Sequence, residues 1–337
     1  MQIRFKKTDD PRLWDSLVAA SPGATGFHDW SWLHLMTETF GWRLTPLVVR
    51  RDGEAVGVFP VVMQSTRVPR SVEPPFPYLG PLVPDDLLEP ILRAFRGWQV
   101  RHGLPVVRFQ FGPGLAGAAE RALRRTPCEW HTDRTFTVDL AGASPESLTA
   151  GMKSNARYHL RTALRRGVQV RPALPGEVTT LLPRVLEESY GNRGVPSPYP
   201  ADLGARLEEW SAGRDDFIAV TAVIDEQAVG VLVALASHPV VTGWVGGSLR
   251  AHRSANPSTV LYHEVLQWSL RRGHTSVDLV GHVDEGVSKF KTAFGSAEVP
   301  YVTAVSSIVP GVVSSAAAAV RSLAIRMLPV RSGRARD

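Results

Sequence analysis

The chain has 337 residues, 44% of them hydrophobic and 21% charged, a composition typical of a soluble globular protein that is long enough for two domains. Lysine and arginine (38) outnumber aspartate and glutamate (32), and the formal charge of +6 is compatible with RNA, nucleotide phosphates or anionic lipids as partners without selecting one. The single cysteine, Cys128, excludes an internal disulfide, and with no Cys/His cluster a metal site is not expected. No signal peptide or apolar run of membrane-spanning length is present, so we expect a cytoplasmic protein.

The first half of the chain is predicted to alternate strands with helices around one hairpin. Residues 47–63 read LVVRRDGEAVGVFPVVM, two apolar strands about an Asp52-Gly53 turn. In chain order, we expect a strand at 3–5, helices at 11–20 and 30–40, the hairpin at 47–63, a strand at 78–82, a helix at 87–102, and strands at 106–111 and 135–140.

The second half is predicted to repeat this order. Residues 217–236 again give two strands about an acidic turn, with the same Ala-Val-Gly-Val. The expected elements that follow are a strand at 244–248, a helix at 259–272 and a strand at 276–280. The agreement of four elements in order and spacing favours a duplicated domain.

The order of elements in each half, with helices, hairpin, strand, helix and strand, predicts a mixed α+β sheet with one helical crossover rather than a doubly wound fold. It resembles the acyltransferase fold of the GNAT superfamily, here as two tandem domains with mostly antiparallel sheets. We place the first domain at 1–146, the second, with the active site, at 147–309, and a C-terminal helix and basic tail at 310–337.

Residues 153–168, KSNARYHLRTALRRGV, predict a helix with one basic face that ends at Gly167. Its apolar stripe is predicted to consist of Met152, Ala156, Leu160, Ala163 and Leu164. The cations beside that stripe are Lys153, Arg157, Arg161, Arg165 and Arg166. Because the helix carries no carboxylate, its charges repel one another and a polyanion is the expected partner; a solvated arginine-rich face is the alternative.

The basic helix, the tandem arrangement and a late motif together resemble the FemABX family of aminoacyl-tRNA-dependent peptidyltransferases and its related acyltransferases. The family's basic helix ends in Lys-x-Gly-Val, seen here as Arg165-Arg166-Gly167-Val168, and its Phe-Lys-x-x-Phe-Gly is seen here as FKTAFG at 290–295. Trp30-Ser31-Trp32, residues 57–60 and Tyr78-Leu79-Gly80-Pro81 also look like the family's first unit.

The resemblance implies transfer of an amino acid from its tRNA ester to an amine, forming an amide. The reaction passes through a tetrahedral oxyanion, which a fixed cation in a dry pocket stabilises, and Lys291 holds that position in the motif. The cations of the basic helix, Lys153, Arg157, Arg161, Arg165 and Arg166, are implied to contact phosphates of the tRNA or of a nucleotide-bearing acceptor.

Other polar residues are candidates by their positions. His282, just after the strand at 276–280, is a candidate proton shuttle. Asp278, on that strand, is a catalytic-site candidate with a structural or acceptor-binding role rather than that of a base. Tyr78, together with Arg193 and Tyr199 from the glycine- and proline-containing loop at 190–199, is a candidate acceptor contact.

The donor is predicted from the segment before the helix at 259–272. A typical CoA-dependent GNAT enzyme carries a glycine-rich loop there, whose N–H groups bind pyrophosphate, but Arg253–Thr259 has no glycine and Pro257 lacks an N–H. This favours aminoacyl-tRNA as donor, with no bound cofactor or metal, and a small molecule or peptidoglycan precursor as acceptor.

Two competing functions remain open: an acyl-CoA-dependent N-acyltransferase and a non-catalytic RNA- or nucleotide-binding module. The segment 310–337 is expected to pack on the first domain and end in a frayed basic tail, with peripheral contact to an anionic membrane as the alternative.

Overall fold

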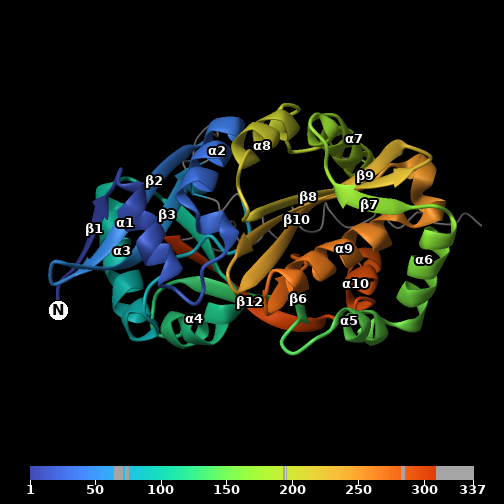
Figure 1. Ribbon diagram of the computed structural model, residues 1–337. Coiled ribbons are helices and arrows are strands. Elements are labelled where there is room, and N and C mark those ends of the chain that lie inside the picture. Colours follow the sequence, from blue (N-terminus) through green and yellow to red (C-terminus); the bar gives the residue numbers. More distant parts are fainter. Residues whose placement is uncertain (64–70, 73–75, 193, 195, 282–284, 309–337) are drawn as a thin grey trace, which may run out of the picture.

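The computed structural model describes residues 1–63, 71–72, 76–192, 194, 196–281 and 285–308, so the predicted C-terminal helix and tail at 310–337 lie outside the described residues. Within these residues the strands form one sheet in the order β1-β2-β3-β4-β5-β12-β6-β11-β10-β9-β8-β7 (Figure 1). Its paired strands are antiparallel except for β4 with β5 and β10 with β11. The expected α+β fold with mostly antiparallel strands is confirmed.

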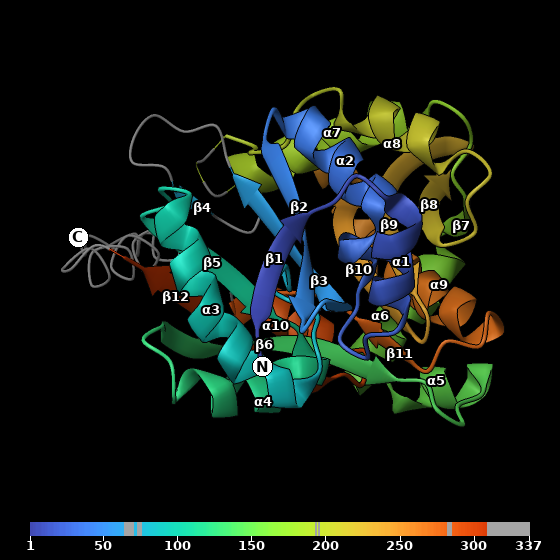
Figure 2. The same cartoon turned by 90° about the vertical axis from the view of Figure 1, so that its left-hand side faces the viewer.

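The first half of the chain builds one end of the sheet. Its strands are β1 (Ile3–Lys7), β2 (Arg43–Arg51), β3 (Glu54–Met63), β4 (Ser71–Val72), β5 (Val106–Phe111) and β6 (Glu129–Asp139). Its helices are α1 (Pro11–Ala19), α2 (Trp30–Phe40), α3 (Leu88–Arg101), α4 (Ala116–Leu123) and α5 (Pro145–Gly151). Figure 2 looks onto this end and shows β1 between α3 and α1.

The second half builds the other end. Its strands are β7 (Gln169–Pro172), β8 (Phe217–Ile224), β9 (Gln227–Ser237), β10 (Val240–Ser248), β11 (Ser276–Asp278) and β12 (Ala297–Ser307). Its helices are α6 (Ser154–Arg165), α7 (Glu177–Gly191), α8 (Leu203–Ser211), α9 (Pro257–Arg271) and α10 (Glu285–Thr292). In Figure 1, α7 and α8 lie on one side of β8, β9 and β10, and α9 lies on the other.

The two predicted hairpins are present and built alike. Both turns use the left-handed backbone region that two-residue hairpin loops favour, at Asp52 (φ 49°) and Gly53 (φ 97°) and at Asp225 (φ 47°) and Glu226 (φ 62°). The glycine of the shared Ala-Val-Gly-Val has the same structural role in both hairpins. A Cβ atom on Gly57 would lie 2.0 Å from the Leu82 carbonyl oxygen, and one on Gly230 would lie 2.8 Å from that of Gly247, so each glycine lets a neighbouring segment approach closely.

Some elements differ from those predicted from the sequence. Residues 78–82 do not form a strand: only an isolated bridge joins Leu82 to Val58. Strand β12 was not predicted, and β6 begins at Glu129 rather than at 135. The domain boundary that we place between residues 146 and 147 falls inside α5, and it stays a prediction.

The two halves exchange strands at the centre of the sheet. Strand β12, from the second half, pairs with β5 of the first half, while β6, from the first half, pairs with β11 of the second. The two exchanged strands also pair with each other over residues 297–305 and 129–137. Each half of the sheet is therefore completed by a strand of the other.

At β9 the sheet separates two apolar cores. Alternate residues of this strand show the division: Val231, Val233 and Leu235 join the core that includes α7, α8 and much of the first half, whereas Leu232 and Ala234 join the core under α9. The second core also buries the apolar side of α6, including Leu160. None of the helices in the described part of the chain has the length and apolar character needed to cross a membrane.

We predict that His28, in the first core, makes stability depend on pH. The side chain is fully buried, and burial lowers the pKa of His28 to about 4 although hydrogen bonds with backbone groups of Thr25, Gly80 and Tyr78 oppose this shift. Because the unfolded chain binds the proton more readily, the free energy of unfolding should fall as pH drops from about 6.5 to 4, by about 3 kcal/mol in total.

The measurement is urea unfolding of the wild type and of His28→Gln across this pH range, with His102→Gln, an exposed histidine, as control. The pH-dependent loss should shrink in His28→Gln alone. An identical pH dependence in all three proteins would contradict the prediction.

Candidate active site

The motif at residues 290–295 and the start of the basic helix are in direct contact. The backbone N–H of Lys153, just before α6, donates to the carbonyl oxygen of Ala293 at 2.8 Å. Gly295 has φ of 79°, and a Cβ atom there would lie 2.8 Å from the carbonyl oxygen of Gly151. The motif glycine thus permits the close approach that anchors α6 on α10, and the two passages singled out in the sequence form one structural unit.

The motif's aromatic residues and its lysine point to different places. Phe290 and Phe294 pack against Tyr262, with ring centroids 5.2 and 5.7 Å from the tyrosine ring, and Phe290 also lines a cavity. Lys291 is 6% exposed, and its Nζ donates to the carbonyl oxygens of Val280 and, at 2.9 Å, Gly281. The ammonium group therefore holds the turn that follows β11.

Asp278, at the end of β11, is 4% exposed and accepts three hydrogen bonds. Its carboxylate accepts from the Tyr78 hydroxyl at 2.7 Å, the Thr135 hydroxyl at 2.6 Å and the Val280 N–H at 2.8 Å. Tyr78 and Thr135 belong to the first half, so this carboxylate joins the two halves. Its hydrogen bond with Val280 also connects it to the turn that Lys291 holds.

Burial determines the acid–base properties of this cluster. It raises the pKa of Asp278, although the hydrogen bonds from Thr135, Tyr78 and Val280 and the charge of Lys291 act in the opposite direction. Burial, and then the nearby Asp278 charge, raise the pKa of Tyr78 well above its usual value. Tyr78 therefore stays a hydrogen-bond donor at physiological pH. Tyr78 is only 1% exposed, so this arrangement offers an acceptor little access to its side chain. The acceptor-binding role of Tyr78 stays a prediction.

A cavity of about 320 Å³ lies where the C-terminal end of β10 meets the N-terminus of α9. The strand contributes Gly246, Gly247 and Ser248, whose backbone is open to the cavity because two of the three have no side chain. At the helix end, the hydroxyl groups of Ser258 and Ser248 are 2.9 Å apart. The remaining lining residues are His159, Val185, Ser189, Arg253, Asn256, Pro257, Thr259 and Phe290.

This cavity can hold an anionic group. Helix α9 directs its N-terminus, the positive end of its dipole, at the cavity wall, and Arg253 adds a full charge. The segment before α9, which has no glycine, forms a 3₁₀ helix at Arg250–Ala255. Asn256 follows in a left-handed conformation (φ 59°), and Pro257 is the first residue of α9.

The structure divides the five predicted phosphate-binding cations into two groups. Arg157 donates to the carbonyl oxygens of Ala150 and Met152, and Arg166 donates to that of Ser254, so these two arginines stabilise local structure. Lys153, Arg161 and Arg165 are exposed on α6. The predicted apolar stripe is correct except for Leu164, which is 55% exposed.

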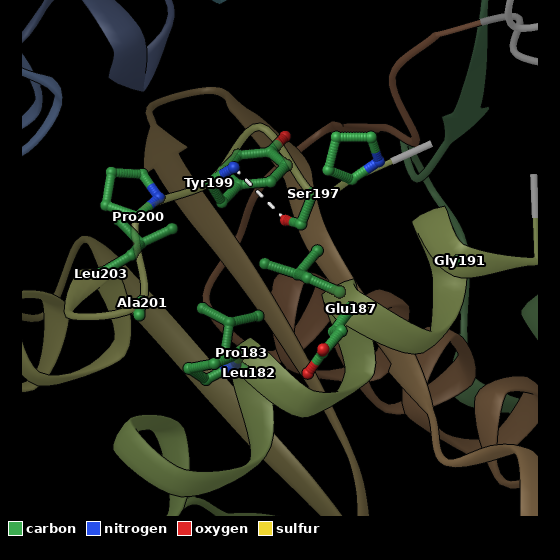
Figure 3. Close-up of a pocket in the computed structure, with 11 residues that line it drawn as sticks. Leu182, Pro183, Glu187, Gly191, Ser197, Tyr199, Pro200, Ala201 and Leu203 are labelled. Atoms are coloured by element: carbon green, nitrogen blue, oxygen red, sulfur yellow. Dashed lines mark hydrogen bonds between the residues drawn. The ribbon is translucent and has the colours of Figure 1, made fainter. Parts of the chain in front are cut away.

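Tyr199 lines a second cavity, of about 440 Å³, between α7 and the segment that leads to α8 (Figure 3). Most lining residues are apolar, among them Leu182, Leu186 and Leu203, and Glu187 is the one charged group among the described residues of this lining. The Tyr199 N–H donates to the Ser197 hydroxyl at 3.3 Å, and burial raises the pKa of Tyr199. Two further predicted site residues, Arg193 and His282, lie outside the described residues.

The sequence reading missed several residues of the site. Thr135 lies in a predicted strand, but an isolated threonine in a strand gives no sign that it bonds a carboxylate 143 positions away. The pair Gly246-Gly247 did carry a signal, because glycine inside a strand marks a close approach of backbone or ligand. His159, which lines the cavity from α6, was read only as part of the basic helix.

Residues 150–292 match the family described as acetyltransferase (GNAT) domain. This segment contains the α9 cavity, Asp278 and Lys291. Comparison with curated proteins finds no match.

Solved structures with the same fold extend the likeness to the whole chain. FemX has a TM-score of 0.70 at 13% identity, covering 90% of this chain and 97% of that one. L-PGS from Bacillus licheniformis has a TM-score of 0.59 at 12% identity, covering 96% and 98%. A tandem GNAT protein from the clavulanic acid biosynthesis pathway has a TM-score of 0.53 at 16% identity, covering 92% and 100%.

These likenesses identify the fold of the chain. The chain has a tandem GNAT acyltransferase fold, and the predicted resemblance to FemABX-like proteins is confirmed at the level of that fold. The chain therefore shares its fold with FemX.

We predict that the hydroxyl of Tyr78 is important for stability. Tyr78→Phe removes a hydrogen bond to a buried carboxylate and should lower the free energy of unfolding by about 2 kcal/mol. Tyr158→Phe, the same change at a tyrosine that is 55% exposed, is the matched control and should change it by less than about 0.5 kcal/mol. Denaturant unfolding measures both, and equal effects of the two substitutions would contradict the assignment.

Proposed function

We propose that the chain is a Fem-like aminoacyltransferase that moves an amino acid from aminoacyl-tRNA onto an amine of a small molecule or cell-wall precursor, forming an amide. The observation that carries this proposal is the position of α6. Its exposed cations Arg161 and Arg165, with Lys153 just before the helix, belong to the segment whose His159 lines the α9 cavity. A polyanion bound along α6 would therefore end beside that cavity.

The chemistry required of the site is charge stabilisation. The acceptor amine attacks the ester carbonyl carbon, a C–N bond forms, and negative charge collects on the carbonyl oxygen. When the C–O bond to the ribose breaks, the amine proton passes to the ribose oxygen. The reaction therefore does not require a protein residue as the final acceptor of this proton. We propose that the charge of Lys291 stabilises the oxyanion, and that Phe290, on the cavity wall, orients the acyl group.

For the acceptor we propose the cavity between α7 and α8. Both cavities are lined by α7, one through Val185 and Ser189 and the other through Leu186 and Glu187. The apolar wall would receive a hydrophobic part of the acceptor, and the Glu187 carboxylate would attract its amine. Tyr199, the acceptor contact predicted from the sequence, would form part of that wall.

An acyl-CoA donor is the second candidate, and one observation favours it. The α9 N-terminus faces the cavity, and a helix N-terminus binds pyrophosphate well even where the preceding loop lacks glycine. Against it stands Pro257, which removes one N–H donor at that end.

The two donors are distinguished by a transfer assay. Aminoacylated tRNA carrying radiolabelled amino acids and radiolabelled acetyl-CoA are supplied separately, with small-molecule extract and wall precursors as acceptors, and half of each sample receives RNase at the start. We expect label in product only from tRNA, and its loss with RNase. RNase-resistant label from acetyl-CoA would instead establish the second candidate.

The role of Lys291 is tested by Lys291→Met, which keeps the length of the side chain and removes its charge. We expect turnover to fall at least about 100-fold while the tRNA dissociation constant stays within about twofold. Lys289→Met is the control, because Lys289 lies in the same helix but is 74% exposed and pairs with Glu285 at 2.7 Å. Retained turnover in a folded Lys291→Met protein would contradict the role.

A further inference from the structure

Two residues that donate hydrogen bonds to Asp278 have backbone conformations that non-glycine residues rarely adopt. Tyr78 has φ of 71° and Val280 has φ of 51°, both in the left-handed region, and the β-branched side chain of Val280 makes this conformation especially unfavourable there. Such strain persists only where neighbouring groups fix the backbone, and it gathers at sites where geometry matters for function. The groups that fix Tyr78 are therefore candidates for a functional role.

Tyr78 is held at both ends. Its hydroxyl donates to Asp278, and its backbone N–H donates to the side-chain oxygen Oε1 of Gln110 at 3.3 Å. The segment lies directly on β5, since a Cβ atom on Gly80 would lie 2.4 Å from the carbonyl oxygen of Gln110. The Tyr78 ring also makes an edge-to-face contact with that of Tyr301, with centroids 5.4 Å apart. Strands β5 and β12 therefore share with Asp278 the task of fixing this tyrosine.

From Gln110 a chain of hydrogen bonds crosses the strands β5, β12 and β6. The amide nitrogen Nε2 of Gln110 donates to the hydroxyl of the fully buried Thr303 at 3.1 Å, and that hydroxyl donates to Asp133 Oδ2 at 2.9 Å. His131 Nε2 lies 3.1 Å from the same carboxylate oxygen. Thr303 is the register partner of both Gln110 and His131, so the chain follows side chains that are neighbours across three strands.

The donors and acceptors allow this chain only one direction. An N–H group only donates, so the Tyr78 amide fixes which way the Gln110 amide points. Burial raises the pKa of Asp133, but hydrogen bonds with His131 and Thr303, together with nearby positive charge, outweigh this effect and lower the pKa. Asp133 is therefore an ionised acceptor at physiological pH, and the hydrogen bond from Thr303 is charge-assisted. Successive hydrogen bonds in one direction strengthen one another.

We propose that Thr303 and Gln110 are positioning residues for Lys291. Through the hydrogen bond from Tyr78 to Asp278 they fix the strained turn whose carbonyl oxygens bind the Lys291 ammonium group. This inference rests on the proposed function, in which Lys291 stabilises the oxyanion, and it adds residues that act only through others. One of them lies on β5 and the other on β12, so the exchange of strands between the halves assembles the chain.

The kinetic test cuts the chain with Thr303→Val, which removes the hydroxyl and keeps the size of the side chain. We expect kcat for aminoacyl transfer to fall at least about 10-fold while KM for aminoacyl-tRNA stays within about twofold, because a misplaced ammonium group weakens transition-state stabilisation alone. Thr303→Ser restores the hydroxyl and should restore kcat. The control is Thr37→Val, which removes a buried hydroxyl that donates to the carbonyl oxygen of Leu33 at 2.7 Å in α2, and it should leave kcat unchanged.

The position of the ammonium group is measured separately by NMR, without any substrate. All five lysines of the chain lie in its described part, and among them Lys291 alone is buried. Protein labelled with ¹⁵N at lysine Nζ should therefore give one ammonium resonance that is protected from exchange with water, and Lys291→Met identifies it by its loss. We expect Thr303→Val to shift or abolish this resonance, and Thr303→Ser and Thr37→Val to leave it in place.

The two measurements separate the positioning role from the proposed function. A resonance that responds to Thr303→Val, in a protein that transfers no label from aminoacyl-tRNA, would support the positioning role and reject the function. RNase-sensitive transfer with an unchanged kcat in Thr303→Val would do the reverse. A lower kcat with an unmoved resonance, or no protected resonance in the wild type, would also overturn the positioning role.

A second variant keeps the test decisive if Thr303→Val does not fold. Asp133→Ala removes the acceptor at the half-buried end of the chain, and we expect the same changes in kcat and in the Lys291 resonance. Asp139→Ala is its control, because Asp139 lies on the same strand and its carboxylate accepts from the Ala141 N–H at 2.9 Å. Equal effects of these two substitutions would overturn the proposal.

Discussion

The structure depends on one buried carboxylate. Asp278 accepts hydrogen bonds from Tyr78 and Thr135 of the first half, both buried, and from the N–H of Val280 in the second. A buried carboxylate without such partners would be strongly destabilising, so the two halves must stay in register for this group to be tolerated. The same carboxylate fixes Val280, whose carbonyl oxygen receives the Lys291 ammonium group. The geometry at the end of β11 is therefore a property of both halves.

A second contact makes the proposed site a single unit. The close approach of Gly295 to Gly151, together with the hydrogen bond from Lys153 to Ala293, places the basic helix against the motif that carries Phe290 and Lys291. Because α6 is anchored at this point, its inner face reaches the core through Leu160 and its His159 reaches the cavity at α9. The basic helix and the motif at 290–295 are thus joined by backbone contacts, and this arrangement should resist salt.

Local patterns in the sequence predicted local structure well. The range of α2 and the hairpin turns at Asp52 and Asp225 follow from periodicity and turn chemistry, which act over a few residues. Strand β12 and the irregular path at 78–82 were not predicted, because the first is stabilised by partners far away in the chain and the second combines strand-like residues with a left-handed Tyr78 (φ 71°). For the site, the family motif singled out Lys291, whose catalytic role stays a prediction. No spacing in the sequence could show that Tyr78 reaches Asp278 across 200 positions or that Lys291 faces the carbonyl oxygens of a turn.

The exchange of β6 and β12 has a consequence for how the chain is made. Strand β5 lacks its neighbour until residues 297–307 have been synthesised, so the first half waits with an unpaired sheet edge through most of translation. Pairings between residues so distant in sequence form slowly, because a long loop must close before they contribute. During synthesis the growing chain therefore keeps one edge of β5 unpaired until β12, its last described strand, can pair with it.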